Sequence, residues 1–209
     1  MDGKHKNALI GALLAVVFVM AVGYAAFAQL LTINGTAQID STWDVHFDPN
    51  QSTSTAVAIV NGGPTGATDP SGTITYSDSQ DKPTVADLAA TLKQPGDTVT
   101  FTLKPTNYGS ISATPASNPV ITYGTNEDSS TMTISNEGRT ATKGNIQWDI
   151  IEGTTVSDSH TITGSNGGSV TSANQDTIVV RATFTGGVNQ AVTTQTANIK
   201  IAINYQQAA

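Results

Sequence analysis

The chain of 209 residues contains no cysteine. Disulfide bonds and thiol catalysis are therefore excluded. The part that follows an N-terminal apolar run is about 180 residues long, which is enough for one large domain with a hydrophobic core of its own. Such a domain can rely on packing for its stability and needs no covalent cross-links.

Charged residues are also scarce, at 12% of the chain, with 9 Lys and Arg against 16 Asp and Glu. Beyond residue 28 these counts are 7 and 15, so that part of the chain carries a net charge of −8. Nucleic acids and anionic membrane surfaces are bound through basic patches, so the composition argues against both as partners. A surface with few charges and many hydroxyl and amide groups suits an extracellular β protein.

The motifs of the common hydrolases are missing. The three histidines, His5, His46 and His160, form no HExxH pair, and no GxSxG sequence marks a nucleophilic serine. Each of these histidines is therefore interpreted as a surface residue. No pair of carboxylates stands out for glycosidase chemistry. We expect a non-enzymatic protein with no catalytic residue, no cofactor and no assigned metal ligand.

Acidic turns are the alternative considered for metal binding. Asp44, Asp48 and Asn50 flank one turn, and residues 126–128 form another. Carboxylate and amide oxygens of this kind are the ligands that calcium prefers. Neither group has the EF-hand spacing, and acidic turns are common in solvated loops, so no metal site is assigned to them.

One long apolar stretch without charge is present, Ala8–Ala28. As a helix its 21 residues would extend about 31 Å, which matches the hydrocarbon thickness of a bilayer. Lys4 and Lys6 precede it and no basic cluster follows, so the positive-inside rule keeps the N-terminus in the cytoplasm. The sequence thus predicts export to the cell surface or beyond, with membrane contact through this helix at least before processing.

Two interpretations of Ala8–Ala28 remain open. Ala26 and Ala28 form a small-x-small site before Gln29, which is typical of the cleavage site of a secretory signal peptide. The run is nevertheless longer than the usual apolar region of a signal peptide, and Tyr24 lies where an interfacial aromatic residue would lie. In the second interpretation the helix is retained, either as a membrane anchor or as the packing helix of a filament subunit.

The rest of the chain alternates apolar and polar residues in short runs, which are separated by turns rich in Gly, Pro and Asn. Such alternation is typical of strands that bury one face. The clearest examples are Val99, Phe101 and Leu103, then Ile146, Trp148 and Ile150, and then Ile178, Val180, Ala182 and Phe184. We predict an all-β fold, a jelly-roll-like antiparallel β-sandwich over residues 29–209, preceded by one hydrophobic helix within residues 1–28.

Three local expectations follow from the same sequence. Gln94–Asp97 predicts a type II turn, with proline at its second position and glycine at its third. Val85–Leu92 is ambiguous, because it suits either a strand or a short helix capped by Thr84. The aromatic residues, Trp43 among them, are expected on inward faces as part of the core and not as a sugar-stacking platform.

Three groups of segments resemble one protein family. They are Tyr24–Phe27 with Leu31–Ala37 and Trp43–Val45; Leu92–Thr102 with Asn107, Gly109, Ser110 and Ala113; and Ile199–Gln206. These segments are similar to parts of exported Gram-positive proteins related to TasA and camelysin. The resemblance implies a jelly-roll sandwich and a role in extracellular biofilm fibres, where the segment after the signal peptide is donated as a strand to the next subunit. Camelysin carries a metallopeptidase label, but these residues contain no ligand motif of such an enzyme.

We therefore expect a structural cell-surface protein that polymerises with other copies of itself into a filament or pilus-like fibre. In one mode, residues 30–39 add a strand to a neighbouring subunit, and Leu31, Ile33 and Ile39 fill its groove. In another mode, a bundle of helices formed by residues 8–28 holds the subunits together. The alternatives are a monomeric membrane-anchored adhesin or binding module and, less favoured, a camelysin-type metallopeptidase.

Overall fold

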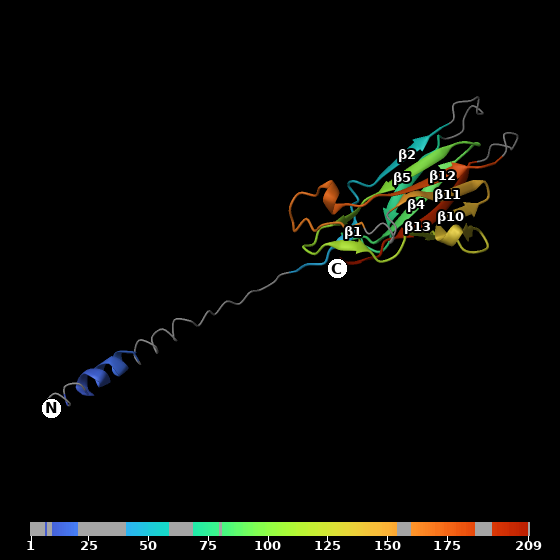
Figure 1. Cartoon of the computed structure of the whole chain (residues 1–209). Coiled ribbons are helices and arrows are strands. Elements are labelled where there is room, and N and C mark those ends of the chain that lie inside the picture. The colour runs from blue at the N-terminus through green and yellow to red at the C-terminus, as the bar shows by residue number, and fades with distance from the viewer. Residues whose placement is uncertain are drawn as a thin grey trace. The chain divides into compact units, whose positions relative to one another are not determined.

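The computed structural model describes residue 7 and residues 10–20, 41–58, 69–79, 81–153, 160–186 and 194–208. The chain divides into two units, Met1–Asp40 and Ser41–Ala209, and each is described by itself. In the first unit, residues 10–20 form the predicted N-terminal helix (Figure 1). The residues of this helix are exposed. The rest of the run Ala8–Ala28 lies outside the described residues. Among the residues that are described, no helix is both long and apolar enough to cross a membrane.

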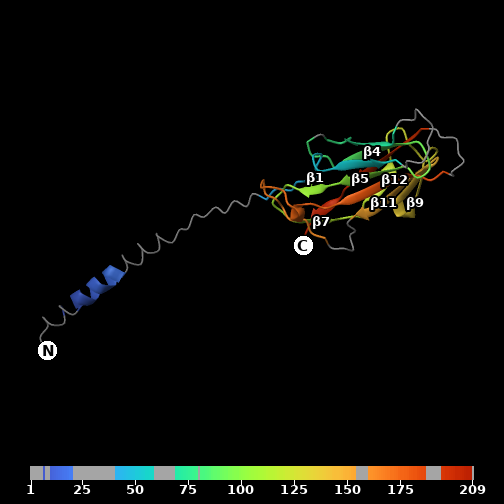
Figure 2. The same cartoon turned by 90° about the horizontal axis from the view of Figure 1, so that it is seen from above.

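The second unit is an antiparallel β-sandwich, as the sequence predicts (Figure 2). One sheet has the strand order β2 (Thr53–Val57), β5 (Thr98–Leu103), β12 (Ile178–Phe184), β11 (Ile146–Gly153), β10 (Thr140–Lys143) and β9 (Thr133–Ser135). The other has the order β3 (Ser71–Tyr76), β4 (Val85–Leu92), β13 (Gln195–Ala202) and β8 (Val120–Tyr123).

Two short strand pairs complete the unit. They are β1 (Val45–Phe47) with β6 (Pro105–Asn107), and β7 (Ala113–Pro115) with β14 (Tyr205–Gln207). The described connections include the short 3-10 helices η1 (Asn136–Gly138) and η3 (Ser172–Asn174). β1 and the C-terminal residues lie at the same end of the sandwich (Figure 1). This end is also where the chain joins the unit at Ser41.

The local expectations about β4 and β5 are resolved by the pairing of these strands. Val85–Leu92 is a strand and not a helix, because β4 lies between β3 and β13 and alternates buried with half-buried residues. The predicted turn Gln94–Asp97 joins β4 to β5. Its Gly96 has a φ of 90°, which glycine adopts without strain, and the Asp97 N–H donates to the Gln94 carbonyl at 3.1 Å.

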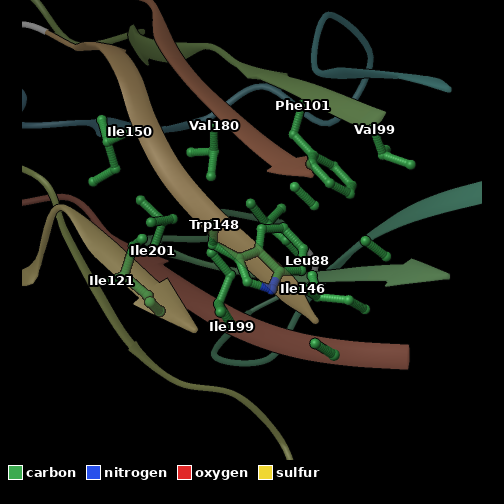
Figure 3. Packing of buried hydrophobic residues seen from close by; sticks show 14 of the residues in the cluster. Leu88, Val99, Phe101, Ile121, Ile146, Trp148, Ile150, Val180, Ile199 and Ile201 are labelled. Carbon is green, nitrogen blue, oxygen red and sulfur yellow. The ribbon is translucent and has the colours of Figure 1, made fainter. Parts of the chain in front are cut away.

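The core lies between the two large sheets, and Trp148 of β11 is its largest fully buried side chain. The Trp148 ring stacks on Phe101 of β5, with 5.5 Å between the ring centroids. Leu88 of β4 and Ile199 of β13 approach the same indole from the opposite sheet (Figure 3). The alternating runs predicted from the sequence therefore supply this core, and burial of their apolar surface is the main source of its stability.

Two expectations near the ends of strands are wrong. Trp43 is 46% exposed, although an inward position was expected, and His46 is only 8% exposed, although a surface position was expected. Both residues lie at the end of the sandwich, where partners from distant segments decide burial. The strand β13 ends at Ala202, and Tyr205 begins β14, which pairs with β7.

Candidate functional site

The site residues predicted from the sequence lie outside the described residues. They are the assembly residues Leu31, Ile33 and Ile39 and the cleavage-site residues Ala26 and Ala28. The structure does describe the strands that could receive such a segment and the end of the sandwich where Ser41 begins the unit. Three features of this part of the molecule carry functional information: an anchored first strand, an open groove and an unpaired sheet edge.

Backbone hydrogen bonds fasten the first residues of the sandwich to the chain after β6. β1 and β6 pair in antiparallel register, and the pairing continues beyond β6, where the Tyr108 N–H donates to the Asp44 carbonyl at 2.8 Å. A Cβ atom at Gly109 would lie 2.3 Å from the carbonyl oxygen of Thr42, so only glycine permits this approach. The chain that leaves the sandwich toward the N-terminus therefore starts from a fixed position.

A polar cluster surrounds the side chains of β1. Asp44 Oδ1 lies 2.8 Å from Nδ1 of His46, and Asp44 Oδ2 accepts a hydrogen bond of 2.7 Å from the Lys82 ammonium. Partial burial opposes ionisation of this carboxylate, but the hydrogen bonds from Lys82 and His46 outweigh it and lower the pKa of Asp44 below its ordinary value. Asp44 is thus held as a carboxylate that joins β1 to the segment before β4.

Tyr108 covers the ring of His46 and completes this cluster. The two rings are stacked, with centroids 4.6 Å apart and planes 15° apart. The Tyr108 hydroxyl donates to Asp48 Oδ2 at 2.9 Å. Burial, the hydrogen bond to Asp48 and the nearby negative charges raise the pKa of Tyr108 to about 12, so the hydroxyl stays protonated in its donor role.

The acidic turn proposed as a calcium candidate is occupied by internal partners. Asp48 Oδ1 accepts the Asn50 N–H at 2.9 Å, while its other oxygen binds Tyr108 and Asp44 binds Lys82. In the described ranges, no group of three or more His, Asp or Glu residues could hold a metal ion. The cluster therefore acts as a structural clasp for β1.

An open groove lies beside this clasp. It has a volume of about 170 Å³, and it is lined by Trp43, Val45, Thr84, Ile203, Asn204 and Tyr205. These residues come from the start of β1, the segment before β4 and the turn between β13 and β14. The exposed indole of Trp43 belongs to this groove and not to the core, where the sequence had placed it.

The C-terminal side of the groove is held by a buried contact. The Tyr205 hydroxyl donates to Asp176 Oδ2 at 2.8 Å, and Nδ1 of His160 lies 3.8 Å from the other oxygen of Asp176. Burial and the charge of Asp176 raise the pKa of Tyr205 well above its ordinary value. Tyr205 remains a neutral hydrogen-bond donor, and its ring is fixed at the groove.

The two large sheets end in β2, β9, β3 and β8, and each of these strands has one strand partner among the described residues. β2 and β3 are linked to each other, because the Ser54 hydroxyl donates to the Gly72 carbonyl at 3.0 Å. β8 pairs with β13, and no further described strand pairs with its other edge. Val120 and Tyr123 of β8 are each 37% exposed. Gly138 of η1 lies against Val120, and the rest of this edge presents apolar surface beside backbone that no described strand pairs.

Comparisons with protein-family models, curated proteins and solved structures found no match to this chain. The fold defines the class of the domain, an all-β antiparallel sandwich. The described part combines an anchored first strand, an open polar groove and a free edge with apolar side chains. This combination can bind a strand or a small polar ligand.

Sequence reasoning missed the groove and the clasp for one reason. Their members lie far apart in the chain, and only the folded structure brings the start of β1 beside the β13–β14 turn. A sequence signal was nevertheless present at Trp43. This residue is one of only two tryptophans, and it lies next to the polar pair Asp44 and His46, outside the clearest alternating runs.

Proposed function

We propose that this protein is an exported, non-enzymatic structural subunit of an extracellular filament that polymerises with other copies of itself. Residues 30–39 of one subunit add a strand to the sandwich of the next. The observation that carries this proposal is the free edge of β8, which combines unpaired backbone with the exposed side chains of Val120 and Tyr123. Strand addition satisfies such an edge through main-chain hydrogen bonds.

The pattern of the donor segment suits the β8 edge. Leu31, Ile33 and Ile39 occupy alternate positions, so in a strand they share one face. That face would continue the inward face of β8, which carries Ile121 and Tyr123. The edge of β2 is a poorer acceptor, because β2 consists mainly of threonine and serine and is linked to β3. The resemblance to proteins related to TasA supports the same mode of assembly.

The described core supports a sandwich that folds before it assembles. All residues of the core cluster lie between Phe47 and Ile201, within the unit that begins at Ser41. In this proposal the N-terminal helix holds the chain in the membrane at least until processing, and the sandwich is outside the cell.

The experiment that tests this function changes the apolar face of residues 30–39 in the full-length protein. In one variant, Leu31, Ile33 and Ile39 are replaced by serine. In the matched control, the alternate positions Thr32 and Asn34 are replaced by serine. We expect fibres by electron microscopy from the wild-type and control proteins and folded but unpolymerised subunits from the variant.

Other outcomes reject the proposal. Normal fibres from the serine variant would rule out strand donation by this segment. If wild-type protein forms no fibres at any concentration tested, the filament function itself is wrong. If fibres persist in the serine variant but disappear when residues 8–28 are deleted, subunits are held by a helix bundle.

A second function is favoured by a different observation. The groove beside Trp43 is open and retains unused hydrogen-bonding groups, which is a property of a binding module. A monomeric, membrane-anchored adhesin would use this groove without assembling. Analytical ultracentrifugation separates the two functions, since an adhesin sediments as a monomer under conditions in which a fibre subunit polymerises.

A further inference from the structure

The groove beside Trp43 has the composition of a site for a small, neutral, polar ligand. None of the six described residues that line it carries a charge. Trp43 presents a flat apolar face, while Thr84 and Asn204 supply hydroxyl and amide groups. A charged ligand would find no opposite charge in this lining, and a purely apolar ligand would leave its polar groups unpaired.

Hydrogen-bonding capacity remains free in the groove. The Asn204 side chain is exposed, and its amide forms no hydrogen bond with another described residue. The Thr84 hydroxyl donates to Asp78 and keeps its acceptor lone pairs. The indole N–H of Trp43 is likewise without a partner among the described residues. One apolar face therefore lies beside at least two donors and two acceptors.

The volume of the groove limits the size of the ligand. About 170 Å³ is smaller than the roughly 300–1,000 Å³ of pockets that enclose whole drug-sized ligands. It suits one six-membered ring whose ends extend into solvent. A pyranose ring meets these requirements, because it has a face of C–H groups that packs on an indole and a rim of hydroxyl groups that donate and accept hydrogen bonds.

We infer that this groove is a subsite for one neutral hexopyranose residue of a polysaccharide. The sugar ring packs on Trp43, and its hydroxyl groups bind Asn204 and Thr84. This activity does not depend on polymerisation, and either a filament subunit or an adhesin could use it to hold polysaccharide.

The lining is fixed before any ligand binds. The backbone on the C-terminal side of Trp43 is anchored through the Asp44 carbonyl by Tyr108, and the ring of Tyr205 is fixed by its hydrogen bond to Asp176. Asp78 accepts hydrogen bonds from both the backbone N–H and the hydroxyl of Thr84. A rigid lining reduces the entropy lost on binding, which matters for a ligand that contacts only a few residues.

A peptide strand is a weaker candidate for the same groove. Strand addition requires free backbone groups, and several of those in the lining are already used. The Ile203 N–H donates to the Thr84 carbonyl at 3.0 Å, and the Asn204 carbonyl accepts the Ala116 N–H at 2.8 Å. The backbone on the Ile203–Asn204 side of the groove is therefore closed to a strand, whereas the outer edge of β8 has no strand partner among the described residues, so the two features are assigned to different ligands.

The two tryptophans allow a direct test by fluorescence in the full-length protein. Trp148 is fully buried and Trp43 is exposed, so the variant Trp148→Phe leaves Trp43 as the only indole emitter. The probes are cellohexaose, chitohexaose and mannohexaose, which are neutral, with polygalacturonate as the charged control. We expect one or more neutral oligosaccharides to protect Trp43 from acrylamide quenching, with a Kd of roughly 1 mM for contact through one ring.

Saturation-transfer NMR with the wild-type background provides a second measurement that does not need Trp148→Phe to fold. Trp43→Ala should abolish the signal of the bound sugar, and Asn204→Ala should weaken binding roughly fivefold through the loss of one hydrogen bond. Tyr123→Ala removes an aromatic residue of similar exposure outside the groove and should leave binding unchanged.

The inference is overturned by any of three results. Neutral oligosaccharides could fail to protect Trp43 at concentrations tenfold above the expected Kd. Trp43→Ala could bind the sugar as well as wild type does. Finally, a synthetic peptide of residues 30–39 could protect Trp43 while the sugars do not, which would assign the groove to the donor segment.

Discussion

Two tryptophans show how position in the fold changes the role of one residue type. Trp148 lies between the two large sheets and stacks on Phe101, so its large apolar surface stabilises the core. Trp43 lies at the end of the sandwich and presents its indole to an open groove. The indole N–H of Trp148 has no hydrogen-bond partner among the described residues, which reduces the net contribution of this residue to stability.

Two substitutions of Trp148 should separate the stabilising effect of its buried ring from the cost of its unpaired indole N–H. Trp148→Ala removes the whole ring and should lower the free energy of unfolding by about 3–5 kcal/mol. Trp148→Phe keeps an aromatic ring against Phe101 and removes the unpaired donor, so the expected loss is only about 1–2 kcal/mol. Urea denaturation measures both values. If both variants lost the same free energy of unfolding, the indole N–H would have a hydrogen-bond partner in solution, and its removal would bring no gain.

At the level of single elements, β1 depends on contacts that its own sequence does not provide. It has only three residues, and a strand of that length is not stable alone. The pairing with β6, the stacking of His46 on Tyr108 and the bridge from Asp44 to Lys82 hold it in place. Because β1 also borders the groove, these contacts link the clasp to the shape of the candidate sugar site.

The Asp44 carboxylate should make the stability of β1 dependent on pH. Its pKa is lower in the folded state than the value of about 3.9 for an unfolded aspartate. The stabilisation is therefore present above about pH 4 and is lost as the pH falls through the folded-state pKa. We expect Asp44→Asn to lower the free energy of unfolding by about 1 kcal/mol at neutral pH.

The measurement is a series of urea denaturations between about pH 2 and pH 6, where the carboxylates titrate. Wild-type protein should lose more stability on acidification than Asp44→Asn. Asp81→Asn makes the same chemical change at an exposed position and should behave as wild type does. Identical pH profiles for wild type and Asp44→Asn would contradict this role of Asp44.

At the level of the whole molecule, the sandwich leaves two kinds of edge. On one side β2 and β3 are linked by Ser54 and Gly72, and on the other β8 has no further strand partner among the described residues. Natural sheets protect exposed edges with charges or cover them, so an edge with exposed Val120 and Tyr123 is suited to pairing with another chain. In the filament proposal, the donor strand therefore pairs with β8 and not with β2.

A charge placed on the correct edge should block assembly. Tyr123→Lys puts a lysine on β8, and Val57→Lys puts one on β2, where Val57 is 54% exposed. Both changes are at exposed positions, so neither should prevent folding. We expect Tyr123→Lys to abolish or strongly reduce fibres in electron micrographs and Val57→Lys to leave them intact. The reverse result would move the acceptor edge to β2.

The sequence by itself determined the fold class and the main core residues. Alternation with period two is a local property, so the inward faces of β5, β11 and β12 could be read from residues such as Phe101, Trp148 and Val180, and each is buried. The turn at Gln94–Asp97 was equally predictable, because proline and glycine restrict the local backbone.

Only the tertiary structure decided the strand order, the free edges and the groove, because each depends on residues that are distant in the chain. His46 is buried by Tyr108, which lies 62 residues later, and Trp43 is exposed because its neighbours across the groove are Ile203 and Asn204. No local pattern carries that information. Periodicity determines which face of a strand is apolar, but long-range packing determines what, if anything, covers it.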